Sequence, residues 1–138
     1  MKWTVALLSL FLFTGSTQAK VCTQEDAAAA DLAVDGLNSW EAIQKNSVDY
    51  GQCDDGSIAE GNSEAVARML VDKWPEIGKL ETLISRDPSL QEYILKHVDS
   101  TLATDDLNRI IELSTKSCPE KNILLCNKLI SAAKKSLE

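Results

Sequence analysis

Apolar residues recur at helical spacing along most of this chain. From Val66 to Trp74 they follow one another at steps of one, three, one and three residues, which places them on one face of a helix. The strict alternation of apolar and polar residues that is typical of a strand does not occur. Four further stretches have helical spacing, and their apolar faces are Ile77/Leu80/Leu83/Ile84, Leu90/Tyr93/Ile94/His97/Val98, Leu107/Ile110/Ile111 and Ile123/Cys126/Ile130/Ala133/Leu137.

Residues that begin and end helices separate these stretches. Thr23 precedes Asp26 by three residues and Ser57 precedes Glu60 by three, and both pairs fit a capping box. Ser39 can cap a short helix that starts at Trp40. The expected helices cover residues 25–35, 40–47 and 57–74, followed by helices that start near Pro75, Asp87–Pro88, Thr104 and Pro119. The sequence therefore predicts an all-α fold, a compact bundle of about six to seven short helices.

Residues 1–19 have the pattern of a signal peptide. Lys2 is followed by an apolar run over residues 5–13 and then by small and polar residues up to Ala19. The run is shorter than the roughly 20 residues that span a bilayer. We expect cleavage after Ala19, which leaves residues 20–138 as a single helical domain in the periplasm or secreted.

The charge of that domain excludes some partner classes. Without Lys2 it holds thirteen basic and twenty-one acidic residues, a net charge of −8. An acidic surface repels nucleic acids and anionic membranes and attracts basic proteins. We therefore expect no nucleic acid and no membrane as partner, and another exported, basic protein as the partner class.

The four cysteines, Cys22, Cys53, Cys118 and Cys126, are expected to form two disulfides in an oxidising compartment. They lack the close ligand pairs of a zinc site. If residues 119–137 form one helix, Cys118 and Cys126 lie roughly 12 Å apart along its axis, beyond the about 7 Å that a disulfide spans. This argues against joining Cys118 to Cys126 and leaves two pairings open.

Three carboxylates, those of Asp54, Asp55 and Glu60, lie near the start of a predicted helix. They are candidates for calcium binding or acid–base catalysis, but no register fits a calcium loop, and acids are common at helix starts because of the helix dipole. His97 is the only histidine, so we expect it to be packed and hydrogen-bonded rather than catalytic. We predict no catalytic residue, no metal and no cofactor.

The loop from Asp49 to Gly56 and the turn that follows it are the predicted partner contact. The contact residues are Asp54, Asp55, Gly56, Glu60 and Gly61. An irregular loop held by a disulfide at Cys53 loses little entropy on binding, and acids there would attract a basic partner. Gly61 inside a helix indicates close helix packing or a partner side chain resting on bare backbone.

Short motifs between residues 47 and 119 resemble a group of small exported helical proteins of Gram-negative bacteria. They are the segment Tyr50-Gly-Gln-Cys-Asp-Asp-Gly-Ser-Ile-Ala-Glu-Gly-Asn-Ser-Glu-Ala-Val66, together with Trp74, the stretch from Leu95 to Thr101, and Cys118-Pro119. The resemblance implies that Cys53 pairs with Cys118, which leaves Cys22 to pair with Cys126. No activity follows from it.

Three functions are considered. We expect a protein-interaction module without catalytic activity, of the inhibitor or immunity-protein class. The alternative is a small-ligand carrier with an apolar pocket between helices, although the cysteine pattern of insect odorant-binding proteins is missing. The third, an enzyme that uses Asp54, Asp55 or Glu60, has only the carboxylates in its favour.

Overall fold

The computed structural model describes residues 19–138, so the predicted signal peptide lies outside the described residues except for Ala19. The described chain forms seven α-helices and four short 3-10 turns, which confirms the predicted all-α fold. The helices are α1 (Gln24–Ala33), α2 (Trp40–Tyr50), α3 (Gly56–Asp72), α4 (Ile77–Arg86), α5 (Ser89–Lys96), α6 (Thr104–Lys116) and α7 (Ile123–Ser136), and the turns are η1 (Val34–Gly36), η2 (Gly51–Cys53), η3 (Trp74–Glu76) and η4 (Glu120–Asn122).

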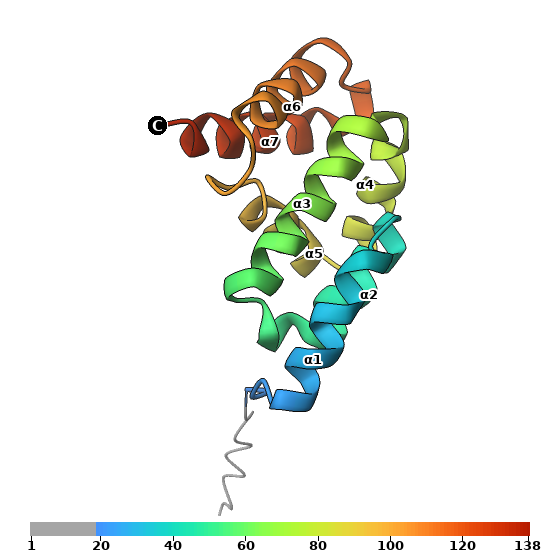
Figure 1. Cartoon of the computed structure of the whole chain (residues 1–138). Coiled ribbons are helices and arrows are strands. Elements are labelled where there is room, and N and C mark those ends of the chain that lie inside the picture. The colour runs from blue at the N-terminus through green and yellow to red at the C-terminus, as the bar shows by residue number, and fades with distance from the viewer. Residues whose placement is uncertain (1–18) are drawn as a thin grey trace, which may run out of the picture.

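The helices are arranged between two ends of an elongated molecule (Figure 1). α1 and the first turns of α3 lie at one end, α6 and α7 lie against each other at the other end, and α3 runs between the two. The core follows this axis and is made largely of aliphatic side chains, among them Leu70, Leu80, Leu90, Ile94, Ile110 and Leu129.

Two of the predicted helix starts are confirmed in detail. The Thr23 side chain accepts from the Asp26 NH and the Asp26 carboxylate accepts from the Thr23 NH, so the capping box is complete. Ser39 caps α2 through the NH of Ala42. The predicted box at Ser57 and Glu60 is wrong, because α3 begins at Gly56 with Asp55 as its N-cap. Gly56 has φ +54°, in the left-handed region that glycine adopts without steric cost.

The predicted inner face of the last helix is also displaced. Leu125, Cys126, Leu129 and Ala133 are the buried residues of α7. Of the predicted stripe, Ile123 and Leu137 are exposed. The prediction began the helix at Pro119, whereas η4 first turns the chain and α7 starts at Ile123.

The disulfides join Cys22 to Cys53 and Cys118 to Cys126, and all four thiols are paired, as expected. The pairing itself differs from both predictions, the one from helix length and the one from the resemblance. Cys118 precedes η4, so the chain turns between the two cysteines and their Cα atoms are 6.3 Å apart. Two disulfides are typical of proteins of oxidising compartments.

None of the helices in residues 19–138 is both long enough and apolar enough to cross a bilayer.

Candidate functional site

The predicted contact loop is regular and firmly attached. η2 ends at Cys53, whose side chain is buried and bonded to Cys22 just before α1. Asp54 and Asp55 are the only two residues between η2 and α3. The loop is therefore fixed on one side by the disulfide and on the other by the start of a helix.

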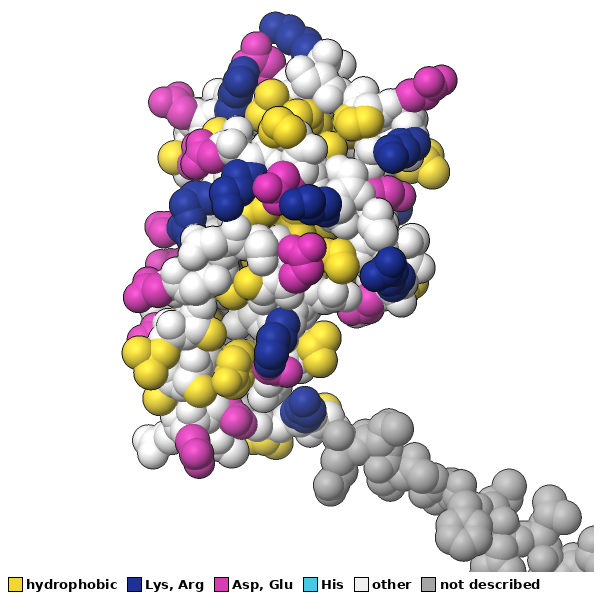
Figure 2. All heavy atoms as spheres, turned by 90° about the vertical axis from the view of Figure 1, so that its right-hand side faces the viewer, with side chains coloured by type: hydrophobic (Ala, Val, Ile, Leu, Met, Phe, Trp, Pro, Cys, Tyr) yellow, Lys and Arg dark blue, Asp and Glu magenta, His cyan; other side chains and the backbone are white. Residues whose placement is uncertain are grey.

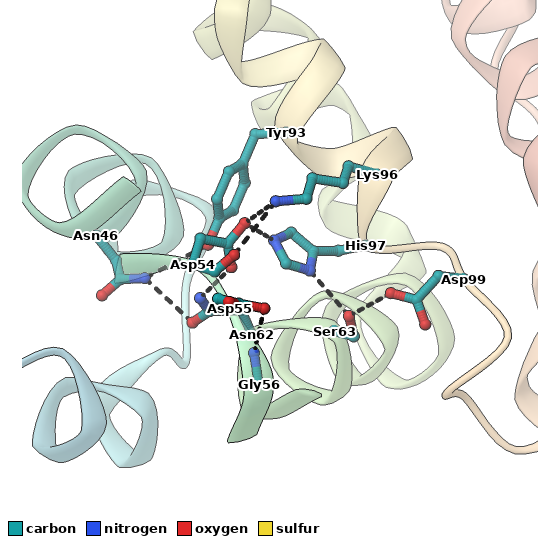
Figure 3. A network of polar contacts seen from close by, with 10 residues as sticks. All are labelled: Asn46, Asp54, Asp55, Gly56, Asn62, Ser63, Tyr93, Lys96, His97 and Asp99. Atoms are coloured by element: carbon teal, nitrogen blue, oxygen red, sulfur yellow. Dashed lines mark hydrogen bonds and ion pairs between the residues drawn. The ribbon is translucent and has the colours of Figure 1, made fainter. Parts of the chain in front are cut away.

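The Asp54 side chain points into the protein and is only 3% exposed. Its carboxylate accepts hydrogen bonds from Lys96 Nζ at 2.5 Å, from His97 Nε2 at 3.1 Å and from Asn62 Nδ2 at 2.9 Å (Figure 3). Lys96 and His97 belong to the end of α5, and Asn62 belongs to α3. Asp54 thus ties the loop to α3, which follows it directly, and to α5, which is distant in sequence.

His97 is buried and holds the next contacts in this network. Its Nδ1 lies 2.8 Å from Ser63 Oγ, and the same oxygen lies 2.7 Å from a carboxylate oxygen of Asp99. The ring also meets the edge of Tyr93, with 4.4 Å between ring centroids. The prediction of a packed, hydrogen-bonded histidine is confirmed.

The number of available protons decides which atom donates in each hydrogen bond of His97 and Ser63. Ser63 has one hydroxyl proton, yet both of its neighbours, His97 Nδ1 and the Asp99 carboxylate, are at hydrogen-bond distance. An imidazolium satisfies every contact: its Nε2–H donates to Asp54, its Nδ1–H donates to Ser63, and Ser63 donates to Asp99. A neutral ring carries one N–H, so while Ser63 donates to Asp99 it leaves either the Nε2–Asp54 contact or the Nδ1–Ser63 contact without a proton. The contacts hold the His97 ring between the carboxylate of Asp54 and, through Ser63, the carboxylate of Asp99.

Serine, histidine and aspartate in a row have the connectivity of a hydrolase triad, but the proton direction is reversed here. In a triad the serine donates to the histidine, whereas Ser63 accepts from His97 and donates to Asp99. Ser63 is also only 1% exposed. This geometry fastens α3 to α5 and does not present a nucleophile.

The network continues to α2 through Asn46. The Asn46 amide lies 3.2 Å from Asn62 Oδ1 and 3.5 Å from the Tyr93 hydroxyl. Buried polar groups with partners on several elements define one packing arrangement more strictly than apolar contacts do. The polar network of Asn46, Asp54, Asn62, Ser63, Tyr93, Lys96, His97 and Asp99 therefore joins α2, α3 and α5.

The network shifts the acidity of its members. Burial alone would raise the pKa of Asp54, but the hydrogen bonds from His97, Lys96 and Asn62 outweigh it and hold this pKa well below its usual range. The pKa of Asp99 is lowered in the same way, against burial, by hydrogen bonds from Thr101 and Ser63. Burial and the negative charge of Asp54 raise the pKa of Tyr93. Both carboxylates are thus stabilised in their charged form.

The predicted contact residues do not all lie on the surface. Asp55, Gly56 and Glu60 are exposed, whereas the carboxylate of Asp54 is enclosed by the network. Gly61 packs against α1's end: a Cβ at this position would lie 2.7 Å from a methyl carbon of Val34. Of the two explanations for Gly61, the structure supports close packing.

Sequence reasoning missed Asn62, Ser63, Lys96 and Asp99. A signal for Asn62 was available, because it precedes Val66 and Leu70 by four and eight residues and so lies on the same inner face of α3. A polar residue in an apolar stripe needs a buried partner. The partner, Asp54, is eight residues away and could not be read from helical spacing.

Charge is distributed unevenly over the surface. Residues 20–64, called the acidic end below, hold ten acidic and two basic residues, while residues 65–138 hold eleven of each. On the face shown in Figure 2, most of the Lys and Arg side chains lie in the upper half, and acidic and apolar side chains lie side by side in the lower half. Within residues 19–138 no group of three or more potential ligand side chains is arranged to hold a metal ion.

Comparisons with protein-family models, with curated proteins and with solved structures found no match to this chain.

Proposed function

We propose that this protein is an exported protein-interaction module of the inhibitor or immunity-protein class, and that its acidic end binds a basic exported protein without catalysing a reaction. The observation that carries the proposal is the concentration of charge: the whole net charge of residues 20–138 lies in residues 20–64. A surface of one charge accelerates association with a partner of the other charge.

Rigidity is the second support. The acidic end is held by the Cys22–Cys53 disulfide and by the polar network around Asp54. A surface that is already ordered loses little conformational entropy when it binds. Exposed Asp55 and Glu60 then remain as charges available to a partner.

The carrier alternative receives less support. A carrier buries most of its ligand in an apolar pocket. Among residues 19–138, one hollow of about 480 Å³ lies at the surface between α5 and α7, lined by Gln91, Leu95, Asn127, Lys128 and Ser131. It is wide open to solvent and would leave much of a ligand exposed.

The test begins with affinity purification of the tagged, exported protein from its host's periplasmic and secreted fractions. The co-purified protein is then bound to the purified wild type at low and high salt. We expect a basic protein whose affinity falls as salt rises. Asp55→Asn combined with Glu60→Gln should weaken binding and reduce the salt dependence. Asn can still cap α3, and Asp54 is left intact because its removal would disturb the fold.

Asp105→Asn combined with Glu120→Gln is the matched control, since it removes two exposed acids outside the acidic end. It should bind like the wild type. The proposal fails if no exported protein co-purifies, if the partner is acidic, or if both double variants bind with the wild-type affinity and salt dependence.

A further inference from the structure

The largest apolar side chain of α1 faces solvent, which is not expected of a helix whose only role is to pack against the core. Its sequence contains five alanines and one large apolar residue, Leu32. Ala30 is its only buried residue, whereas Leu32 is 78% exposed. A surface helix normally turns its largest apolar side chain toward the core. The outer face of α1 therefore carries an apolar side chain that the fold does not use.

Leu32 is not alone in this part of the molecule. Val21 is 78% exposed and Val48 is 58% exposed. Val21 precedes Cys22, which is bonded to Cys53, and Val48 lies on α2 shortly before η2. Val21 and Val48 therefore lie near the start of α1, whereas Leu32 lies in its last turn.

Acidic residues surround this apolar face. Asp31 and Asp35 are exposed on either side of Leu32 in sequence, and Glu25 is exposed at the other end of α1. An apolar centre with a charged rim is the arrangement of protein–protein contacts, in which a few buried side chains supply most of the affinity. The sign of the rim selects a partner with basic residues around an apolar pocket.

We propose that the outer face of α1, with Leu32 at its centre and acids at its rim, is the surface that docks the basic exported partner. This assignment rests on the proposed function and adds the place of contact. The exposed residues Asp55 and Glu60 continue the same acidic surface, because η2 and the first turns of α3 lie beside α1.

The chain offers a matched control for Leu32. Leu124, on the first turn of α7, is 79% exposed and lies at the opposite end of the molecule. Its sequence neighbours Lys121 and Lys128 are basic and Glu120 is acidic, so the charges near it are mixed. The two leucines therefore have nearly the same exposure but differ in the charge of their surroundings.

The experiment replaces Leu32 or Leu124 by the photo-crosslinking residue p-benzoylphenylalanine in the full chain, exported by its own host. After irradiation, adducts are identified by mass spectrometry. We expect a basic exported protein attached at position 32, with a yield at least tenfold higher than at position 124. With that protein purified, Leu32→Ala should weaken binding at least tenfold and Leu124→Ala less than twofold. Both variants should melt like the wild type, because neither side chain is buried.

Every outcome other than the expected one contradicts the assignment of the partner contact to the outer face of α1. Equal yields at the two positions, or a higher yield at position 124, place the contact elsewhere while the proposed function stands. If the protein attached at position 32 is a second copy of this chain or an acidic protein, then the surface does not bind a basic exported partner. If the wild type co-purifies a basic protein but position 32 gives no adduct, the surface is wrong. If neither experiment yields a partner, the proposed function fails as well.

Discussion

The acidic end and the pair formed by α6 and α7 are held together by different forces. In α1 only an alanine is buried, and the first buried residues of α3 are Asn62 and Ser63. The large buried apolar side chains of the acidic end are those of Leu37, Trp40 and Ile43, and a disulfide and polar contacts attach the rest of it. α6 and α7 are also linked by a disulfide, Cys118–Cys126, but they pack mainly through aliphatic side chains such as Ile110, Leu113, Leu125 and Leu129. Covalent and polar attachment needs few large apolar residues, which leaves the acidic end with a charged surface and Leu32 free for contact.

Removal of either disulfide should give the largest losses in the free energy of unfolding. The two losses show which end depends more on its disulfide. Cys22–Cys53 spans 31 residues and Cys118–Cys126 spans 8. The chain-entropy relation gives about 3.7 kcal/mol for the longer loop and about 2.5 kcal/mol for the shorter one. Paired Cys→Ser variants unfolded in urea measure both values. A larger loss for the Cys118–Cys126 variant would contradict the predicted order, and no loss for the Cys22–Cys53 variant would show that the acidic end does not depend on its disulfide.

Truncation of the core should destabilise the α6–α7 end. Leu129 is fully buried, so Leu129→Ala should lower the free energy of unfolding by about 3 kcal/mol, through lost burial and the cavity that remains. The control Leu124→Ala removes an equal side chain from the surface and should change it by less than about 0.5 kcal/mol. Similar effects of the two variants in urea unfolding would refute the packing of α7 described above.

Loss of the Asp54 charge should weaken the acidic end in turn. Asp54→Asn keeps the size of the side chain but leaves His97 and Lys96 without their carboxylate, at a cost of about 2 kcal/mol. Asp55→Asn, one residue further on, should cost less than about 0.5 kcal/mol, because Asp55 is exposed and Asn also caps helices. Thermal and urea unfolding compare the two. Equal losses would mean that the polar network contributes nothing beyond the cap.

The sequence anticipated what local signals determine and missed what tertiary contacts determine. Thr23 and Ser39 begin their helices as expected, because a cap is a matter of three or four neighbouring residues. The Cys118–Cys126 disulfide was missed because η4 depends on how the chain returns to the bundle. At the site, the exposure of Asp55 and Glu60 was anticipated, but the burial of Asp54 needed His97 and Lys96, more than forty residues away in the sequence.

Low pH should destabilise the acidic end by protonating the Asp54 carboxylate. Because the pKa of Asp54 is lower in the folded protein than its ordinary 3.8, its contribution to stability is complete above that value and is lost as the pH falls below about 4. We expect a loss on the order of 1 kcal/mol after allowance for solvent screening. Urea unfolding at pH 7 and pH 3 should show a smaller difference for Asp54→Asn than for the wild type. An equal difference would assign the acid sensitivity to other groups.

Two glycine substitutions should give the smallest effects, with opposite signs. Gly61→Ala introduces a Cβ 2.7 Å from a methyl carbon of Val34, and the resulting overpacking should lower stability by about 1 kcal/mol, net of the gain in helix propensity. Gly78→Ala in α4 meets no atom within 4 Å and should raise stability by up to about 1 kcal/mol. Melting temperatures of the two variants test whether the stability changes have opposite signs. A rise for both would mean that Gly61 of α3 does not approach Val34 closely.

Hydrogen exchange tests most directly the central claim, that the disulfide and the Asp54 network hold the acidic end in a fixed shape. The amides of α1, α2 and the start of α3 should be protected in the wild type. In Asp54→Asn, exchange should rise in residues 22–64 and stay unchanged in α6 and α7. An acidic end that exchanges rapidly in the wild type, or an Asp54→Asn variant in which both ends change equally, would contradict the claim.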